Sequence, residues 1–99
     1  MTKLKAAMLQ SHVYSDKAEN IRALCVNLEE LAKEKPDLVT LPEMFNCPYQ
    51  SSNFPVYAEK EGEETWQALS SLAAKYGIYL SAGSVPETDE QGHIFNTAY

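Results

Sequence analysis

Glu43 is the side chain in this sequence best placed for acid–base chemistry. It directly follows a short β-rich segment, in the order Leu41-Pro42-Glu43-Met44-Phe45. Pro42 restricts φ, so the carboxylate leaves the strand end at a defined angle. Met44 and Phe45 are expected to desolvate the carboxylate and bring its proton affinity closer to that of a general base. A carboxylate that only caps a turn is the alternative interpretation.

Tyr49 and Phe45 are the candidate substrate contacts beside this glutamate. The Tyr49 hydroxyl, on the loop that follows Glu43, could donate to a carboxylate or an amide of a substrate. It is therefore expected to shape substrate selectivity and not to take part in proton transfer. Packing within the loop is the alternative for Tyr49, and a place in the core is the alternative for Phe45.

The two cysteines offer neither a disulfide framework nor a metal site. Cys25 and Cys47 lack Cys-x-x-Cys spacing and a nearby His-x-x-x-His partner. Cys25 falls on the apolar stripe of an expected helix, so we place it in the core. Cys47 lies close to Glu43, but no neighbouring cation would activate its thiol. Neither is expected to be a nucleophile, and no metal or other cofactor is predicted.

The first half of the chain predicts a β-α-β unit that positions Glu43. Residues 4–9 form a short apolar segment suited to a strand, and residues 17–34 carry apolar side chains at helical spacing after Asp16, a capping residue. Pro36 ends this helix, and residues 38–41 form the second strand. Strands joined by such a crossover are parallel.

The second half predicts a loop, a helix and a hairpin. Residues 42–62 contain three prolines and are expected to be irregular. Residues 63–77 form a helix whose apolar stripe starts at Trp66, residues 78–85 a third strand, and residues 94–99 a fourth. We expect the first three strands in one sheet, both helices on one face of it, and the fourth strand paired with the third. His93 lies in the exposed turn, and His12 after the first strand is expected to be solvated or capping.

Composition limits the function classes. A chain of 99 residues with 44% hydrophobic and 22% charged side chains suits a single folded unit. A net charge of −6, from 14 acidic and 8 basic residues, disfavours nucleic acid as a partner. No apolar run is long enough for a membrane span, and few cysteines suit a reducing, cytoplasmic location. The last six residues resemble a strand interior, so we expect the chain to be truncated.

The segment after the second strand resembles the first signature of the nitrilase, or carbon–nitrogen hydrolase, superfamily. The resembling run is Leu41-Pro42-Glu43-Met44-Phe45-Asn46-Cys47-Pro48-Tyr49, and it continues through Phe54-Pro55-Val56-Tyr57-Ala58-Glu59, Ser81-Ala82-Gly83-Ser84-Val85-Pro86-Glu87 and Phe95-Asn96-Thr97-Ala98. The first two of these runs look most like the ω-amidase branch. Those enzymes hydrolyse the terminal amide of short dicarboxylic acid monoamides to carboxylate and ammonia.

This resemblance implies an α/β fold, the N-terminal part of an α-β-β-α sandwich that runs β-α-β-α-β-β in residues 1–99. It also implies a homo-oligomer and a Glu-Lys-Cys triad, of which this chain supplies only the general base, Glu43. The chain alone is therefore expected to be inactive. Asn96 matches a polar family position that hydrogen-bonds within the fold. An N-carbamoyl or other aliphatic amidase, and a non-catalytic binding or assembly module of the same fold, remain alternatives.

Overall fold

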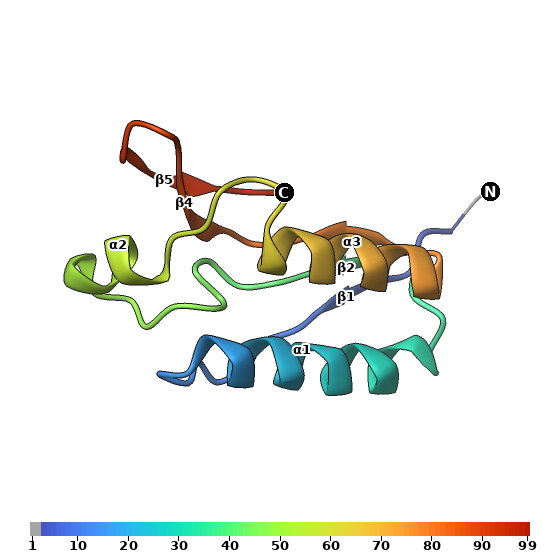
Figure 1. The fold of residues 1–99 in the computed structure, drawn as a ribbon. Coiled ribbons are helices and arrows are strands. Elements are labelled where there is room, and N and C mark those ends of the chain that lie inside the picture. The colour runs from blue at the N-terminus through green and yellow to red at the C-terminus, as the bar shows by residue number, and fades with distance from the viewer. Residues whose placement is uncertain (1–2) are drawn as a thin grey trace.

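The computed structural model describes residues 3–99 (Figure 1). It contains the predicted β-α-β unit, second long helix and hairpin in the predicted order, but the third strand is divided and the long loop holds two short helical turns. The parallel sheet and its helices are β1 (Ala6–Met8), α1 (Lys17–Ala32), β2 (Leu38–Thr40), α3 (Glu64–Tyr76) and β3 (Tyr79–Ser81). A short 3-10 turn, η1 (Ser51–Asn53), and one turn of helix, α2 (Phe54–Tyr57), interrupt the long loop, and β4 (Val85–Thr88) and β5 (Ile94–Thr97) form the hairpin. Among residues 3–99, no helix is long and apolar enough to cross a membrane.

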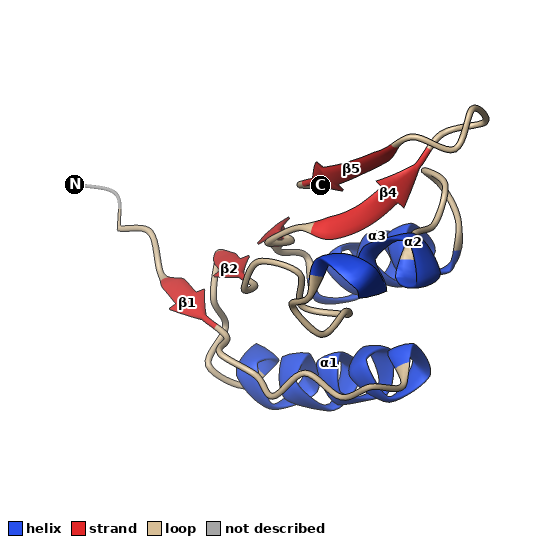
Figure 2. Ribbon diagram, turned by 90° about the vertical axis from the view of Figure 1, so that its left-hand side faces the viewer, coloured by secondary structure: helices blue, strands red, loops and turns tan. Residues whose placement is uncertain are grey.

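The three-stranded sheet is parallel, with β2 in the middle. Ala7 pairs with Val39, and Val39 pairs with Leu80. These three side chains face the hydrophobic core, whereas Met8 and Tyr79, on the other face, are 86% and 79% exposed. Helices α1 and α3 contact each other and lie on one side of the sheet (Figure 2). The predicted placement of both helices on one face is confirmed.

The predicted third strand is wrong as a single strand, because the chain bends between β3 and β4. Gly83 adopts a left-handed φ of +51° at the bend. Strand β4 then pairs with β5 in a separate antiparallel sheet, with Val85 opposite Thr97 and Thr88 opposite Ile94. The hairpin itself is confirmed, but it belongs to a second sheet.

Helix α1 begins where its capping residue predicts, and its buried stripe is narrower than expected. Asp16 Oδ1 accepts a hydrogen bond from the Ala18 amide at 3.0 Å. The buried side chains are Asn20, Leu24 and Leu28, four residues apart. Cys25 is exposed, so its expected place in the core is wrong. The reason is geometric: one residue turns a helix by about 100°, which carries Cys25 away from the Leu24 stripe.

Helix α3 contributes its own buried stripe to the core. Leu69 and Leu72 are buried and Tyr76 packs against the core, whereas Trp66 is 39% exposed. The buried position at the start of the helix belongs instead to Thr65, which is polar. The α3 stripe therefore faces the sheet as predicted, except at its first member.

Candidate active site

Glu43 follows β2, as the sequence predicts, and the structure shows that β2 is the middle strand of the parallel sheet. Ligands of open α/β sheets collect beyond the carboxyl ends of their strands, which is where this residue stands. Its side chain is exposed. Met44 and Phe45 are buried in the interior, whereas the Glu43 carboxylate faces outward. The expectation that these two neighbours desolvate the carboxylate is therefore wrong.

The backbone on both sides of Glu43 is held by the bend between β3 and β4. A Cβ on Gly83 would meet the carbonyl oxygen of Pro42 at 2.0 Å, so the two chain segments touch through their backbones. The Met44 amide donates to Ser84 Oγ at 3.0 Å, and the Phe45 amide donates to the Ser84 carbonyl at 3.3 Å. Met44 itself has a φ of +52°, which is uncommon for a residue with a side chain.

Asn96 of β5 contacts the Glu43 carboxylate directly. Its Nδ2 donates to Oε2 of Glu43 at 2.9 Å. The family resemblance implies a hydrogen bond of Asn96 within the fold but not its partner, and the structure shows that the partner is Glu43. The β4–β5 hairpin follows the bend at Gly83 (Figure 1), and its second strand carries Asn96, which reaches the glutamate that follows β2.

The other candidate residues divide between surface and core. Tyr49 is 67% exposed and makes an edge-to-face contact with Phe54, with ring centroids 5.6 Å apart. Phe45 lies in the hydrophobic core cluster, which was the alternative left open for it. Cys47 is buried, and its Sγ donates to the Pro48 carbonyl at 3.4 Å. Burial raises the pKa of the Cys47 thiol, and the charge of Lys17 opposes this shift only in part.

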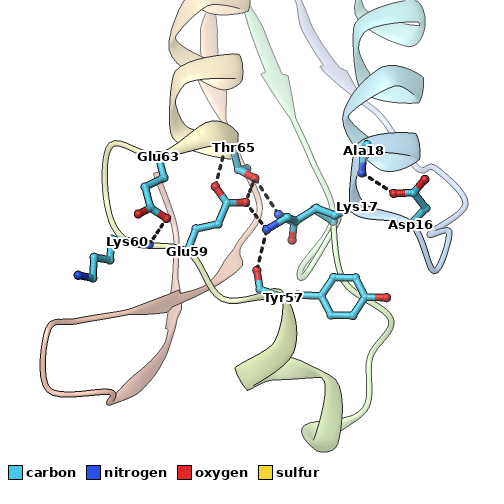
Figure 3. Close-up of polar contacts among 9 residues, drawn as sticks. Asp16, Lys17, Ala18, Tyr57, Glu59, Lys60, Glu63 and Thr65 are labelled. Atoms are coloured by element: carbon cyan, nitrogen blue, oxygen red, sulfur yellow. Dashed lines mark hydrogen bonds and ion pairs between the residues drawn. The ribbon is translucent and has the colours of Figure 1, made fainter.

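A polar network that the sequence analysis missed joins the loop after Glu43 to both helices. Lys17 Nζ lies 2.8 Å from Glu59 Oε2, with side-chain exposures of 24% and 12%, and donates to the Tyr57 carbonyl at 3.1 Å (Figure 3). Glu59 accepts from both the amide and the hydroxyl of Thr65. The Thr65 hydroxyl in turn accepts from Asn46 Nδ2 at 3.0 Å. No spacing rule could have found this network, because its members are far apart in sequence.

This network favours the ionised form of Glu59. Its burial acts to raise the pKa, but the hydrogen bonds from Lys17 and Thr65 and the charge of Lys17 together outweigh burial and lower the pKa of Glu59. A charge taken out of water needs such partners. The network therefore connects α1, the loop after Glu43 and α3 through hydrogen bonds and one ion pair.

Among residues 3–99, neither histidine forms a hydrogen bond or an ion pair with Glu43. His93 Nδ1 pairs with Asp89 Oδ2 at 2.9 Å in the exposed turn, and hydrogen bonding from His93 lowers the pKa of Asp89. His12 is exposed and packs edge-to-face on Tyr14. Within residues 3–99, no three His, Cys, Asp or Glu side chains form a group that could hold a metal ion.

Known proteins resemble this chain over nearly all of its length. The carbon-nitrogen hydrolase family model matches residues 5–99. The omega-amidases NIT2 of Mus musculus and Homo sapiens are 42% and 41% identical over 97 residues, which is 98% of this chain and 35% of each relative. The chain thus spans about a third of the length of the curated relatives it matches.

Solved structures share the fold. The crystal structure of Saccharomyces cerevisiae Nit3, a member of branch 10 of the nitrilase superfamily, superimposes with a TM-score of 0.87 at 36% identity, over 96% of this chain and 38% of that one. XC1258 from Xanthomonas campestris, a CN-hydrolase superfamily protein with an arsenic adduct in its active site, gives 0.82 at 29% identity, over 97% and 35%.

The parallel β-α-β-α-β layer with a carboxylate after its middle strand defines an α/β protein with a candidate acid–base site. The family match narrows this class. The chain belongs to the carbon–nitrogen hydrolase family, within the nitrilase superfamily.

Proposed function

We propose that this chain is the N-terminal portion of a single carbon–nitrogen hydrolase domain of the ω-amidase type. The observation that supports the proposal best is the placement of Glu43: it follows the middle strand, its backbone is held on both sides, and its carboxylate reaches open surface. The similarity to omega-amidases favours short dicarboxylic acid monoamides over other amides as substrates.

In the proposed reaction Glu43 is the general base. It takes the proton of a cysteine thiol, and the thiolate attacks the amide carbon while a lysine stabilises the oxyanion. Glu43 gives this proton to the leaving nitrogen and ammonia departs. Water activated by the same carboxylate then hydrolyses the thioester to a carboxylate and the free thiol. The thiol and the lysine are assigned to parts of the complete protein outside residues 1–99. No cofactor enters these steps.

Two further side chains are assigned to the substrate pocket. Tyr49 has a free face beside Phe54 and is proposed to donate to the substrate. Phe45, buried beneath the same loop, is proposed to shape the pocket floor by packing. A homo-oligomeric assembly and a cytoplasmic location complete the proposal.

The test is ammonia release from short ω-amides by the complete protein that carries this chain. Glu43→Gln keeps the size and hydrogen-bonding capacity of the side chain but removes the base, so turnover should fall by about 10²–10⁴-fold or more. Thermal unfolding of the variant should match that of the parent, because the Glu43 side chain is exposed.

Glu90→Gln is the matched control, since Glu90 is an exposed glutamate in the hairpin turn. It should leave turnover unchanged. Near-normal hydrolysis by Glu43→Gln would remove Glu43 from the mechanism. A parent that hydrolyses N-carbamoyl compounds but not ω-amides would favour the N-carbamoyl amidase alternative, and a parent that hydrolyses neither would favour the binding module.

A further inference from the structure

One segment of the chain, residues 82–97, holds Glu43 from three directions. Gly83 lies against the Pro42 carbonyl, and Ser84 binds the amides of Met44 and Phe45. These contacts restrain the backbone on both sides of the glutamate. The third contact comes from Asn96 and reaches the carboxylate itself.

The Asn96 side chain projects from a well-anchored position. Asn96 lies opposite Pro86 in the β4–β5 ladder, and Pro86 is fully buried. A donor carried on a paired strand is held more rigidly than one on a free loop. Its hydrogen bond to Glu43 Oε2 therefore fixes the orientation of the carboxylate as well as its position.

The two oxygens of the carboxylate are consequently unequal. Oε2 accepts from Asn96, whereas Oε1 has no hydrogen-bond partner among the residues that the structure describes. Among the other ionisable side chains of the hairpin, Glu87 accepts from the Tyr99 hydroxyl, Asp89 pairs with His93, and Glu90 is exposed in the turn.

We propose that Asn96 is a positioning residue for Glu43, which holds Oε2 and leaves Oε1 as the atom that accepts the proton. This inference rests on the proposed amidase function. In the step concerned, the cysteine S–H bond breaks, an O–H bond forms at Oε1, and the electron pair stays on sulfur. Asn96 takes no proton; its hydrogen bond to Oε2 keeps the lone pair of Oε1 oriented toward the thiol.

Two variants in the complete protein test this role against a structural one. Asn96→Ala removes the donor. Asn96→Asp keeps the shape of the side chain but places a second negative charge against Glu43. Because a hydrogen bond to a charged group is strong, we expect kcat to fall by about 10- to 100-fold in Asn96→Ala, and further in Asn96→Asp, with KM nearly unchanged.

The pH–rate profile separates positioning from packing. A neighbouring negative charge disfavours the ionised carboxylate, so the acidic limb should move to higher pH in Asn96→Asp, and less in Asn96→Ala. Gln91→Glu, which adds the same charge in the exposed turn of the same hairpin, should leave kcat and the profile unchanged. The proposal would be overturned if kcat in Asn96→Asp were unchanged. It would also be overturned if the rate of Asn96→Asp fell by the same factor at every pH, with no shift of the acidic limb.

A measurement on the 99-residue chain tests the contact apart from catalysis. In NMR titrations the Asn96 side-chain amide resonances should move together with the Glu43 carboxyl carbon, and this coupling should disappear in Glu43→Gln. No common titration would overturn the contact and with it the positioning role. An inactive parent with the contact intact would instead count against the amidase function.

Discussion

At the residue scale, Gly83 allows the bend between β3 and β4 to lie against the backbone that precedes Glu43. Its φ of +51° suits glycine, and its missing side chain leaves room for the Pro42 carbonyl and the Leu41 carbonyl. The same bend carries Ser84, whose hydroxyl accepts from the amide of Met44 in its left-handed conformation. Strain of this kind persists where surrounding contacts hold it, as they do here.

Gly83→Ala should therefore destabilise the chain more than an ordinary glycine substitution does. An alanine at this φ costs about 1–2 kcal/mol, and the contact with backbone oxygen adds about 1–3 kcal/mol of overpacking. Gly77→Ala is the control, because Gly77 has a similar φ of +61° but open space at its Cβ position. Chemical denaturation of both variants measures the difference; equal losses would show that the Pro42 contact imposes no cost.

At the scale of elements, the Lys17–Glu59–Thr65–Asn46 network compensates for short strands. Each strand has only three or four residues, so the ladders alone hold the elements weakly. The network connects the first turns of α1 and α3 to the loop between β2 and α3 (Figure 3). The loop that follows Glu43 is thereby anchored by two sets of hydrogen bonds. Asn46 bonds to Thr65, and the amides of Met44 and Phe45 bond to Ser84.

The network predicts a specific acid sensitivity. The pKa of Glu59 is lowered in the folded chain, so its stabilising contribution is present above the unfolded value, 4.5, and is lost as pH falls through the folded value. Thermal unfolding measured from about pH 7 to about pH 3 should show a steeper loss of Tm for the parent than for Glu59→Gln. The two should converge at the acidic end.

Glu34→Gln is the control for this series. Glu34 pairs with Lys5 at 3.6 Å on the exposed surface, where an ion pair contributes little. Its variant should follow the parent across the whole pH range. An acid dependence in Glu59→Gln as steep as that of the parent would assign acid unfolding to other carboxylates.

At the scale of the whole molecule, α1 and α3 cover one face of the parallel sheet, and the other face of that sheet is open. Met8 and Tyr79 lie exposed on that face. Figure 2 shows both long helices on the opposite side of the sheet. This is the arrangement expected of one half of an α-β-β-α sandwich. It also agrees with a chain that spans about a third of its curated relatives.

The isolated 99-residue chain should release no ammonia from short ω-amides. Its Cys47 thiol is buried with a raised pKa, Cys25 is exposed on α1, and Lys17 is engaged by Glu59. The raised pKa leaves the Cys47 thiol without the activation that a nucleophile requires. The assay needs an active omega-amidase as a positive control. Turnover by the isolated chain, abolished by Cys47→Ser, would overturn the view that the nucleophile lies elsewhere.

Local chemistry in the sequence determined which elements form and where Glu43 stands among them. Asp16 caps α1, apolar spacing identifies both long helices, and Pro42-Glu43 follows a β-rich segment; each signal acts over a few residues, so it can be recognised from the sequence alone. Only the tertiary structure decided the break at Gly83, the exposure of Cys25, the outward turn of Glu43 and its bond to Asn96. Each of these depends on a partner or a face that is distant along the chain, such as Pro42 against Gly83, and local periodicity carries no information about such contacts.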